Sequence, residues 1–257
     1  MAISHLSYRL YRDARRDGWL PTGGSILEFG EANWYNDVDA AVLLGDIDQF
    51  ITSPEKKVQL QDRFHTIDPA SASWLFDIAH LFYDIIFEPS QRKAIDLNGT
   101  PEALQLDLND PVELGETFDI CINNGTAEHV FDIANFFRTM HKATRPGGLM
   151  FHEAPMTGWL DHGFYNFQPT FFFDLAAANA YQIIGIFVCD LKNVGIAPLT
   201  DRKVAHRMAR DNQLPDNANL FVAFRKSSVE SVFRTPQQAV YDGRLDEEEV
   251  GDWSTLR

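Results

Sequence analysis

The sequence has few cysteines and few basic residues, and both shortages exclude classes of protein. Its 257 residues include only two cysteines, Cys121 and Cys189, each inside an apolar stretch. We therefore expect buried, reduced thiols and no disulfide framework. Lys and Arg together number 22 against 37 Asp and Glu, which gives a formal net charge of −15. Nucleic acids and anionic membrane surfaces attract clustered Lys and Arg, so we expect neither as a partner.

Long apolar segments are also missing. No run approaches the roughly 18 apolar residues of a membrane span. The beginning of the chain, MAISHLSYRLYRDARRDGW, has polar residues where a secretory signal needs an apolar core. The sequence therefore predicts a cytoplasmic protein, and its apolar fraction of 45% is typical of a globular one.

Short apolar runs alternate with helical patterns along the chain. Strands are predicted at residues 25–30, 93–97, 104–108, 118–124, 149–152, 181–189 and 218–225, and helices at 54–87, 126–144 and 170–179. This alternation predicts an α/β fold with a mostly parallel sheet and helices on both faces. Such sheets bind ligands at the carboxyl ends of their strands.

The composition divides the chain into three predicted parts. Residues 1–24 form a helical lead-in, and residues 25–226 form the α/β domain. Residues 227–257 are a polar, acidic tail that we expect to be partly ordered at most.

Three acidic residues each follow a predicted strand. Glu28 lies in the turn SILEFGEANWY together with Gly30, which permits a sharp turn and a close approach of the backbone to a ligand. Asp96 ends the second strand, where a carboxylate can accept hydrogen bonds from ribose hydroxyls, and Asp107 follows the third. Taken one at a time, each residue also fits an ordinary turn or helix cap.

Together, these acids resemble those of the class I S-adenosylmethionine-dependent methyltransferases. In that family an acid and glycines after the first strand lie under the methionine part of the cofactor, a second acid holds the ribose, and a third meets the adenine amine. The stretch FDICINNGTAEHVFDIANFFRTMHKATRPGGLMFHEAP, residues 118–155, is similar to the family's fourth strand, the next helix and the turn into the fifth strand. The resemblance covers roughly residues 20–225. It implies a Rossmann-like, seven-stranded sheet and S-adenosylmethionine as the cofactor.

The resemblance also implies which residues contact the cofactor. They are Glu28, Gly30, Glu31, Asn33, Asp96, Leu97, Asp107, Leu108, Asn124 and Gly125.

The chain departs from the family pattern in two places. Ala32 and Trp34 replace the second and third glycines of the first loop, so this loop must take another path. About 66 residues separate Gly30 from Asp96, where roughly 20 are usual. We therefore expect a helical cap inserted at about residues 38–90. The glycine pattern also argues against a nicotinamide oxidoreductase, which needs G-x-G-x-x-G.

Three histidines follow successive predicted strands. A histidine near its reference pKa of ~6.5 is suited to remove the proton of an acceptor hydroxyl as a general base. We predict His129 and His162 in this role, with His152 behind them. Each of the three also fits a structural histidine.

A metal site is the alternative use of these residues. His152, Glu153, Asp161 and His162 offer nitrogen and oxygen ligands of the kind that zinc or iron sites use. Adjacent residues on a strand point to opposite faces, however, so His152 and Glu153 do not readily bind one ion. The sequence therefore predicts no metal.

Aromatic residues are concentrated between residues 154 and 173. In related methyltransferases this region commonly lines the acceptor pocket, and aromatic walls suit a small organic acceptor and exclude water. Packing against the helix at 170–179 is the alternative. Substrate contacts are expected from Trp34, Tyr35, Glu128, Trp159, Phe164 and Tyr165.

The sequence as a whole predicts a methyltransferase that moves a methyl group from S-adenosylmethionine to an oxygen or nitrogen of a small metabolite, with a histidine as general base. The alternative keeps the fold and the cofactor but has another reaction, or a non-catalytic interaction role. The apolar insert is compatible with a homo-oligomer. The acceptor itself is not identified by the sequence.

Overall fold

The computed structural model describes residues 2–255. The chain divides into two compact units between Asp107 and Leu108. This boundary lies inside the predicted domain of residues 25–226, so the three-part division made from the sequence stays a prediction. Among the described residues, no helix combines the length and the apolar character needed to cross a bilayer.

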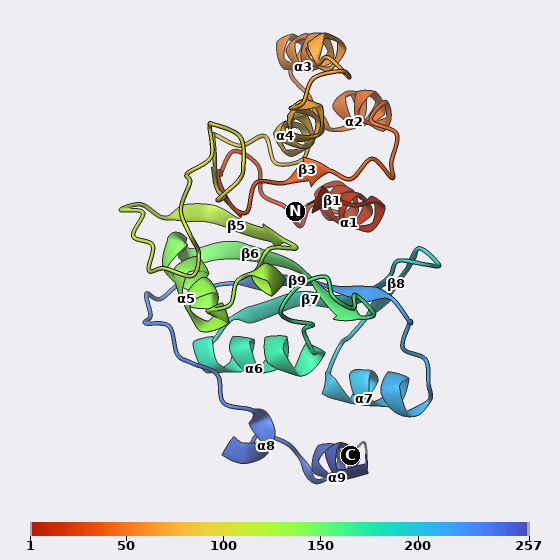
Figure 1. The fold of residues 1–257 in the computed structure, drawn as a ribbon, viewed down its shortest axis with the longest axis vertical. Helices are drawn as coiled ribbons and strands as arrows, with labels where there is room; N and C mark the ends of the chain where they lie inside the picture. The colour runs from red at the N-terminus through yellow and green to blue at the C-terminus, as the bar shows by residue number, and fades with distance from the viewer. Residues whose placement is uncertain (1, 256–257) are drawn as a thin grey trace. The chain divides into compact units, whose positions relative to one another are not determined.

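The first unit combines parallel strand pairs with helices (Figure 1). Its elements are β1 (Ala2–Ile3), α1 (His5–Arg16), β2 (Ser25–Phe29), β3 (Asn33–Trp34), α2 (Val42–Phe50), α3 (Pro54–Thr66), α4 (Trp74–Ile86) and β4 (Gln91–Ile95). β2 pairs in parallel with β4, and β1 pairs in parallel with β3. β2 carries the apolar residues Ile26, Leu27 and Phe29, and every residue of it except Ser25 is buried.

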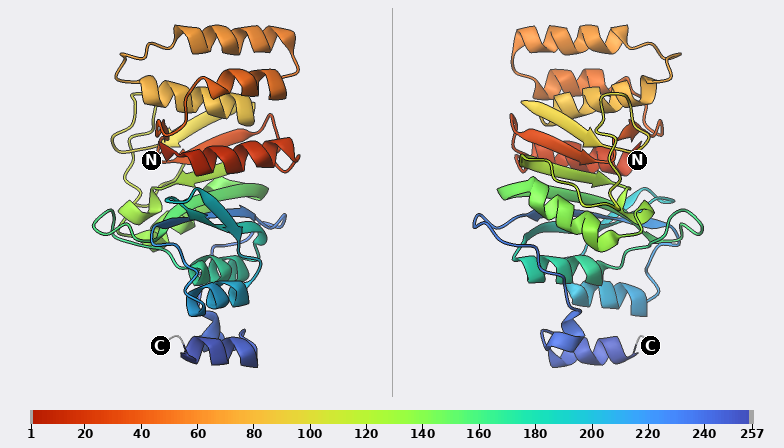
Figure 2. Two further views of the ribbon diagram at one scale, coloured as in Figure 1. Left: turned by 90° about the vertical axis from the view of Figure 1, so that its right-hand side faces the viewer. Right: turned by 60° about the vertical axis from the view of Figure 1, so that its left-hand side comes forward.

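Helices α2, α3 and α4 occupy the region predicted as a helical insertion and pack on one another (Figure 2). α4 carries the predicted apolar stripe and packs against β3. The helix predicted at 54–87 is in fact two helices. Pro69 disfavours a helical backbone at the residue before it, and Ile67 is already extended, with φ −66° and ψ 120°.

Helix α2 was not predicted, because a charged residue interrupts its apolar face. Asp46 is buried in α2, where its carboxylate accepts hydrogen bonds from the hydroxyl of Tyr8 at 2.7 Å and from Nε of Arg12 at 2.6 Å. Both partners belong to α1. Asp46 therefore occupies a position on the buried face of α2, where helical periodicity predicts an apolar side chain, and forms an ion pair with α1 instead.

The second unit is built on a five-stranded layer (Figure 1). Its elements are β5 (Phe118–Asn124), η1 (Ala127–His129), α5 (Ile133–Ala143), β6 (Thr144–Thr157), α6 (Pro169–Asn179), β7 (Gln182–Asp190), β8 (Gly195–Pro198), α7 (Arg202–Arg210), β9 (Ala218–Arg225), α8 (Ala239–Asp242) and α9 (Glu247–Thr255). The order is β5-β6-β9-β7-β8. β5 and β6 are parallel, and β9 is antiparallel to both β6 and β7. β5, β6 and β7 therefore run in one direction.

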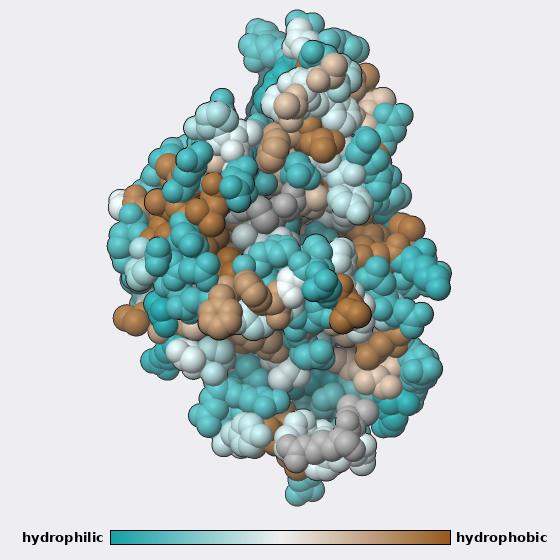
Figure 3. Space-filling model, viewed as in Figure 1, coloured by the Kyte–Doolittle hydropathy of each residue, from teal (hydrophilic) through white to brown (hydrophobic). Residues whose placement is uncertain are grey.

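The α/β fold predicted from the sequence is confirmed. Parallel strands and helices occur in both units. In the second unit, α5 packs on β5 and β6, and α6 packs on β7 and β9. Hydrophilic residues cover most of the face drawn in Figure 3, in line with the net charge of −15.

The acidic tail contains the short helix α8 and the helix α9. Asp174 of α6 connects it to the rest of the unit: its carboxylate accepts hydrogen bonds from the backbone N–H of Ala239 at 3.3 Å and from Arg244 at 3.2 Å. These contacts join distant segments, so the composition of the tail gave no sign of them.

Candidate functional site

Glu28 holds the turn that follows β2. Its side chain is fully buried, and its carboxylate pairs with Arg92 of β4 at 2.9 Å. The second oxygen accepts a hydrogen bond from the backbone N–H of Ala32 at 3.0 Å. Burial raises the pKa of Glu28 to about 7 even though Arg92 opposes this shift. The buried Glu28 carboxylate therefore holds the backbone of the loop after β2 in place.

Asp96 is fixed at the carboxyl end of β4. Its two carboxylate oxygens accept hydrogen bonds from the backbone N–H groups of Glu31 at 3.0 Å and of Asn98 at 2.8 Å. Gly30 is joined to the same strand end, because its N–H donates to the carbonyl of Ile95 at 2.7 Å. Carboxylate oxygens accept more than one hydrogen bond each, so this arrangement leaves Asp96 able to accept donors from a ligand.

Glu31 is the centre of a buried polar network. Its carboxylate lies 3.0 Å from Nε2 of His80 and accepts hydrogen bonds from the hydroxyl of Thr100 at 2.9 Å and the N–H of Thr100 at 2.6 Å. A Cβ atom at Gly99 would lie 2.7 Å from a Glu31 oxygen, so this turn requires glycine. His80 was not among the residues predicted from the sequence. It is a polar residue in the middle of the apolar stripe of α4, and this interruption is the one sign of it in the sequence.

The residues after Glu31 form a strand where the family pattern has more glycine. Asn33 and Trp34 make up β3, and Trp34 is fully buried, with its indole N–H donating to the carbonyl of Val38 at 2.8 Å. Its ring packs edge-on against Tyr8, at 5.8 Å between centroids. The structure therefore places Trp34, which was predicted to contact substrate, in the core of the first unit. Tyr35, by contrast, is 65% exposed.

The remaining predicted cofactor residues differ in exposure. Leu97 is exposed beyond β4, and Asp107 is half-buried at the end of the first unit. In the second unit, Leu108 is buried and its carbonyl accepts a hydrogen bond from Asn135 at 3.0 Å. Leu108 thus anchors the start of that unit.

A tight turn follows β5 in the second unit. The side-chain oxygen of Asn123 accepts hydrogen bonds from the N–H groups of Thr126 at 2.9 Å and Ala127 at 3.1 Å, which starts η1. Asn124 is buried, and Gly125 has φ +81° and donates its N–H to the carbonyl of Glu153 at 2.9 Å. The turn is therefore preformed, with η1 directly after it.

Glu128, His129 and His162 form a cluster, which we call the Glu-His-His cluster. Oε1 of Glu128 lies 3.9 Å from Nε2 of His129 and 3.8 Å from Nε2 of His162, and the two imidazole centroids are 4.9 Å apart. Burial raises the pKa of Glu128 to about 7 and lowers the pKa of His129, so burial favours the neutral form of both groups. The structure thus brings together both predicted bases and one predicted substrate residue.

The loop at 158–167 is docked onto η1 through its backbone. The N–H of Phe164 donates to the carbonyl of Glu128 at 2.7 Å, and a Cβ atom at Gly163 would lie 2.9 Å from that oxygen. Trp159 and Asp161 adopt left-handed backbone angles, with φ +55° and +62°, which are costly for residues other than glycine. The strained loop is held in one path, and that path carries His162 to Glu128.

Aromatic side chains occur in the segments that carry the cluster. Trp159 lies against His162, with 4.5 Å between ring centroids, and Phe131 meets Phe164 edge-on at 5.7 Å. Phe131 is 71% exposed and Phe164 64%, whereas the hydroxyl of Tyr165 donates to the carbonyl of Phe131 at 2.8 Å. The exposed Phe131–Phe164 pair offers an apolar surface to an organic molecule.

His152 lies apart from this cluster. It is fully buried on β6 among the rings of Phe137, Phe172 and Phe224, at 5.3, 5.5 and 5.8 Å between centroids. Burial lowers its pKa to about 3, so it stays neutral at ordinary pH. The structure gives His152 a packing position with no path to an acceptor, and we do not include it among the catalytic residues. Its neighbour Glu153 accepts a hydrogen bond from Asn219 at 2.8 Å.

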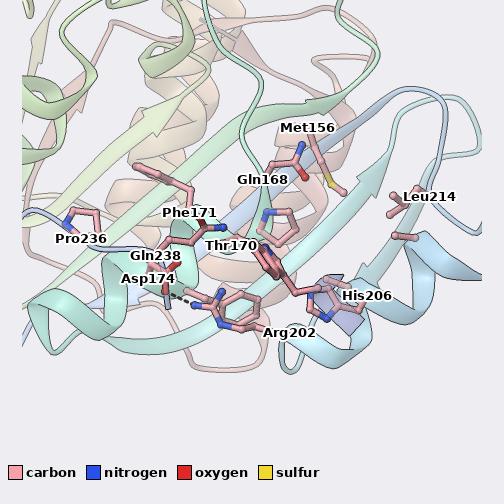
Figure 4. Close-up of a pocket in the computed structure, with 15 residues that line it drawn as sticks. Met156, Gln168, Thr170, Phe171, Asp174, Arg202, His206, Leu214, Pro236 and Gln238 are labelled. Atoms are coloured by element: carbon pink, nitrogen blue, oxygen red, sulfur yellow. Dashed lines mark hydrogen bonds and ion pairs between the residues drawn. The ribbon is translucent and has the colours of Figure 1, made fainter. Parts of the chain in front are cut away.

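A separate pocket of about 630 Å³ lies between α6, α7 and the tail (Figure 4). Within it, Asp174 pairs with Arg202 at 2.5 Å, and the Arg202 guanidinium lies over Phe173 at 5.2 Å. The size is within the range of small-molecule sites. None of the site residues predicted from the sequence lines it.

Residues 71–152 match the family model described as a methyltransferase domain. The resemblance to methyltransferases is thereby confirmed. The matched segment contains Asp96, the turn at Asn124–Gly125 and Glu128 with His129. It lacks the first loop, where the chain departs from the family pattern. Methyltransferases of this class take their methyl group from S-adenosylmethionine, so this is the cofactor that the match indicates.

Curated relatives match shorter parts of the chain. The ubiquinone biosynthesis O-methyltransferase of a Methylobacterium species is 32% identical over 112 residues, which are 37% of this chain and 45% of the relative. The protein of the same name from Rhizobium rhizogenes is 54% identical over 39 residues, 15% of this chain and 16% of the relative. The chain therefore matches less than half the length of each of these relatives.

Solved methyltransferases share a more distant likeness. The N-methyltransferase NodS from Bradyrhizobium japonicum, in complex with S-adenosylhomocysteine, is 11% identical with a TM-score of 0.46, over 87% of this chain and 88% of that one. A methyltransferase from Mesorhizobium loti is 16% identical with a TM-score of 0.42, over 83% and 96%. Similarity at this level does not bear on function.

Proposed function

We propose that the chain is an S-adenosylmethionine-dependent methyltransferase that acts on an oxygen or nitrogen of a small molecule. The match of residues 71–152 to a methyltransferase domain carries this proposal. The names of the curated relatives, which are O-methyltransferases, favour oxygen. Asp96, held at the carboxyl end of β4 by two backbone N–H groups, is suited to contact the cofactor.

The protein's own contribution to methyl transfer is alignment and proton removal. The sulfonium already activates the methyl group, so the nucleophile has to be held in line at about 3 Å from it. A hydroxyl must also lose its proton. We assign this activation to the Glu-His-His cluster, in which the imidazole of His129 or His162 accepts the proton as a general base.

Calorimetry with S-adenosylhomocysteine tests the cofactor part of the proposal. We expect binding in the micromolar range that Asp96→Ala abolishes. Asp48→Ala, which removes an exposed carboxylate from α2, is the matched control and should leave the affinity unchanged. No measurable heat with the unmodified chain would overturn the proposal.

The altered first loop favours one alternative. Because β3 stands where the family pattern has glycines, a protein that binds the cofactor without transferring methyl groups fits the same fold. Tight binding of S-adenosylhomocysteine together with no methyl transfer across a panel of small hydroxyl and amine compounds would support this alternative over the enzyme.

A further inference from the structure

Glu128 has a buried carboxylate that is only partly satisfied. The side chain is 3% exposed, and its Oε2 atom has no hydrogen-bond partner among the residues that the structure describes. A buried acceptor without a donor is costly, because it has lost its water without replacement. The other oxygen, Oε1, is the atom nearer the two histidines, so the carboxylate as a whole has unused capacity to bind a cation.

Two imidazoles face the same carboxylate. His129 and His162 come from different segments, η1 and the loop after β6, and their side chains are 44% and 39% exposed. One ligand atom from each of the three residues lies within 4.8 Å of the other two. The side of the cluster away from Glu128 is therefore open to molecules from solution.

Backbone hydrogen bonds hold the loop after β6 against η1. The N–H groups of Phe164 and Tyr165 both donate to the carbonyl of Glu128, at 2.7 and 3.3 Å. Only glycine fits at position 163, because a Cβ atom would approach that carbonyl to 2.9 Å. The chain thus holds His162 over Glu128 independently of any contact between their side chains.

We propose that Glu128, His129 and His162 bind a divalent transition-metal ion of the zinc type. Two imidazoles and one carboxylate are the ligands of sites that keep coordination positions open for substrate. Ligand atoms at about 2.1 Å from zinc in a tetrahedral arrangement lie about 3.4 Å apart. The two carboxylate–imidazole separations of 3.8 and 3.9 Å exceed this by a few tenths of an ångström, and all three ligand atoms lie within 4.8 Å of one another. Binding the ion therefore requires a rotation of the two half-exposed imidazoles.

The ion would take part in the proposed methyl transfer, and its chemical role rests on that proposed function. An acceptor hydroxyl bound to the ion loses its proton to water, since the ion lowers the pKa of a bound hydroxyl. The oxygen then forms a bond to the methyl carbon, the carbon–sulfur bond breaks with its electron pair going to sulfur, and S-adenosylhomocysteine leaves as a neutral thioether. With the ion present, the imidazoles act as ligands and no longer as bases.

Calorimetry with Zn²⁺ alone, on the untagged, metal-free chain, tests the site without cofactor or acceptor. We expect one ion per chain, and at least tenfold weaker binding in each of Glu128→Gln, His129→Ala and His162→Ala. His65→Ala, which removes an exposed histidine of α3, should not change the affinity. Should Glu128→Gln fail to fold, the two histidine variants, whose side chains are half-exposed, still decide the test.

Two results would overturn the ion site: an unmodified chain that does not bind Zn²⁺, or binding that the cluster variants leave unchanged. If S-adenosylhomocysteine still binds in either case, the proposed function survives and activation reverts to the imidazoles as bases. Zn²⁺ binding that depends on the cluster, in a chain that does not bind S-adenosylhomocysteine, supports the site and overturns the proposed function instead.

Discussion

His80 shows how one residue controls a turn that is distant in sequence. It lies 49 positions from Glu31, yet its Nε2 atom is 3.0 Å from the Glu31 carboxylate, and both side chains are buried. Glu31 in turn donates its backbone N–H to Asp96. The position of the carboxylate expected to hold the ribose therefore depends on a helix of the inserted region.

Replacing His80 should destabilise the first unit and weaken cofactor binding. In His80→Ala, Glu31 stays buried with one donor fewer, and a hydrogen bond to a charged group contributes about 1.5–3 kcal/mol. We expect a loss of that size in the free energy of unfolding, measured with urea, and a weaker affinity for S-adenosylhomocysteine. His80→Gln keeps a side-chain N–H donor and should lose less. Equal stability of His80→Ala and the unmodified chain would contradict the role assigned to the Glu31 network.

The Glu-His-His cluster should affect turnover and not cofactor binding. We expect His129→Ala or His162→Ala to lower the rate of methyl transfer about 100-fold or more, the scale of acid–base catalysis. The affinity for S-adenosylhomocysteine should stay within about twofold, and His65→Ala should match the unmodified chain in both measurements. Unchanged turnover in both cluster variants would refute the assignment.

At the scale of elements, the apolar strands were predictable and the polar-faced helices were not. β2, β5 and β9 each contain more apolar than polar residues, and the structure has them within a residue of the predicted limits. α7 was missed because five of its nine residues are basic and none is fully buried. β8 is a four-residue strand made by pairing with β7, which no local pattern reveals.

The candidate site was predictable to the extent that its residues follow strands. Glu28, Asp96 and Glu128 are each at or directly after a strand end, so the α/β pattern was sufficient to select them. The contact of His80 with Glu31 and the contact of His129 with His162 join segments that are distant in sequence, so no local pattern predicts them. His152 also follows the pattern, but its aromatic neighbours come from α5, α6 and β9, and their packing decides its burial.

The loop after β6 can be tested as an element with a pair of glycine substitutions. Gly163→Ala places a Cβ atom 2.9 Å from the Glu128 carbonyl, so the loop must move away and take His162 with it. We expect turnover to fall at least tenfold while the affinity for S-adenosylhomocysteine is kept. Gly45→Ala is the matched control: nothing lies within 4 Å of its Cβ position in α2, and alanine should stabilise that helix by up to about 1 kcal/mol. A fully active Gly163→Ala variant would show that the loop path is not required.

At the scale of the whole molecule, acid stability should depend on His152. Its pKa is about 3 in the folded chain and about 6.5 when unfolded, so unfolding takes up a proton between these values. The stabilising effect of the neutral, buried ring is complete above pH 6.5 and is lost as the pH falls toward 3. His152→Leu removes this group and leaves the other titrating groups in place. Between pH 6 and 4, the free energy of unfolding of the unmodified chain should fall more steeply than that of the variant, by up to about 1.4 kcal/mol per pH unit. Parallel pH profiles in urea denaturation would contradict this prediction.

Because His80 is on α4, the three helices between β3 and β4 cannot be removed without changing the surroundings of Glu31. A shortened chain that joined Tyr35 directly to Pro89 would lack the whole insertion, and the buried Glu31 carboxylate would then lose its imidazole partner. Any attempt to trim this protein to a minimal core would therefore have to redesign position 31 at the same time.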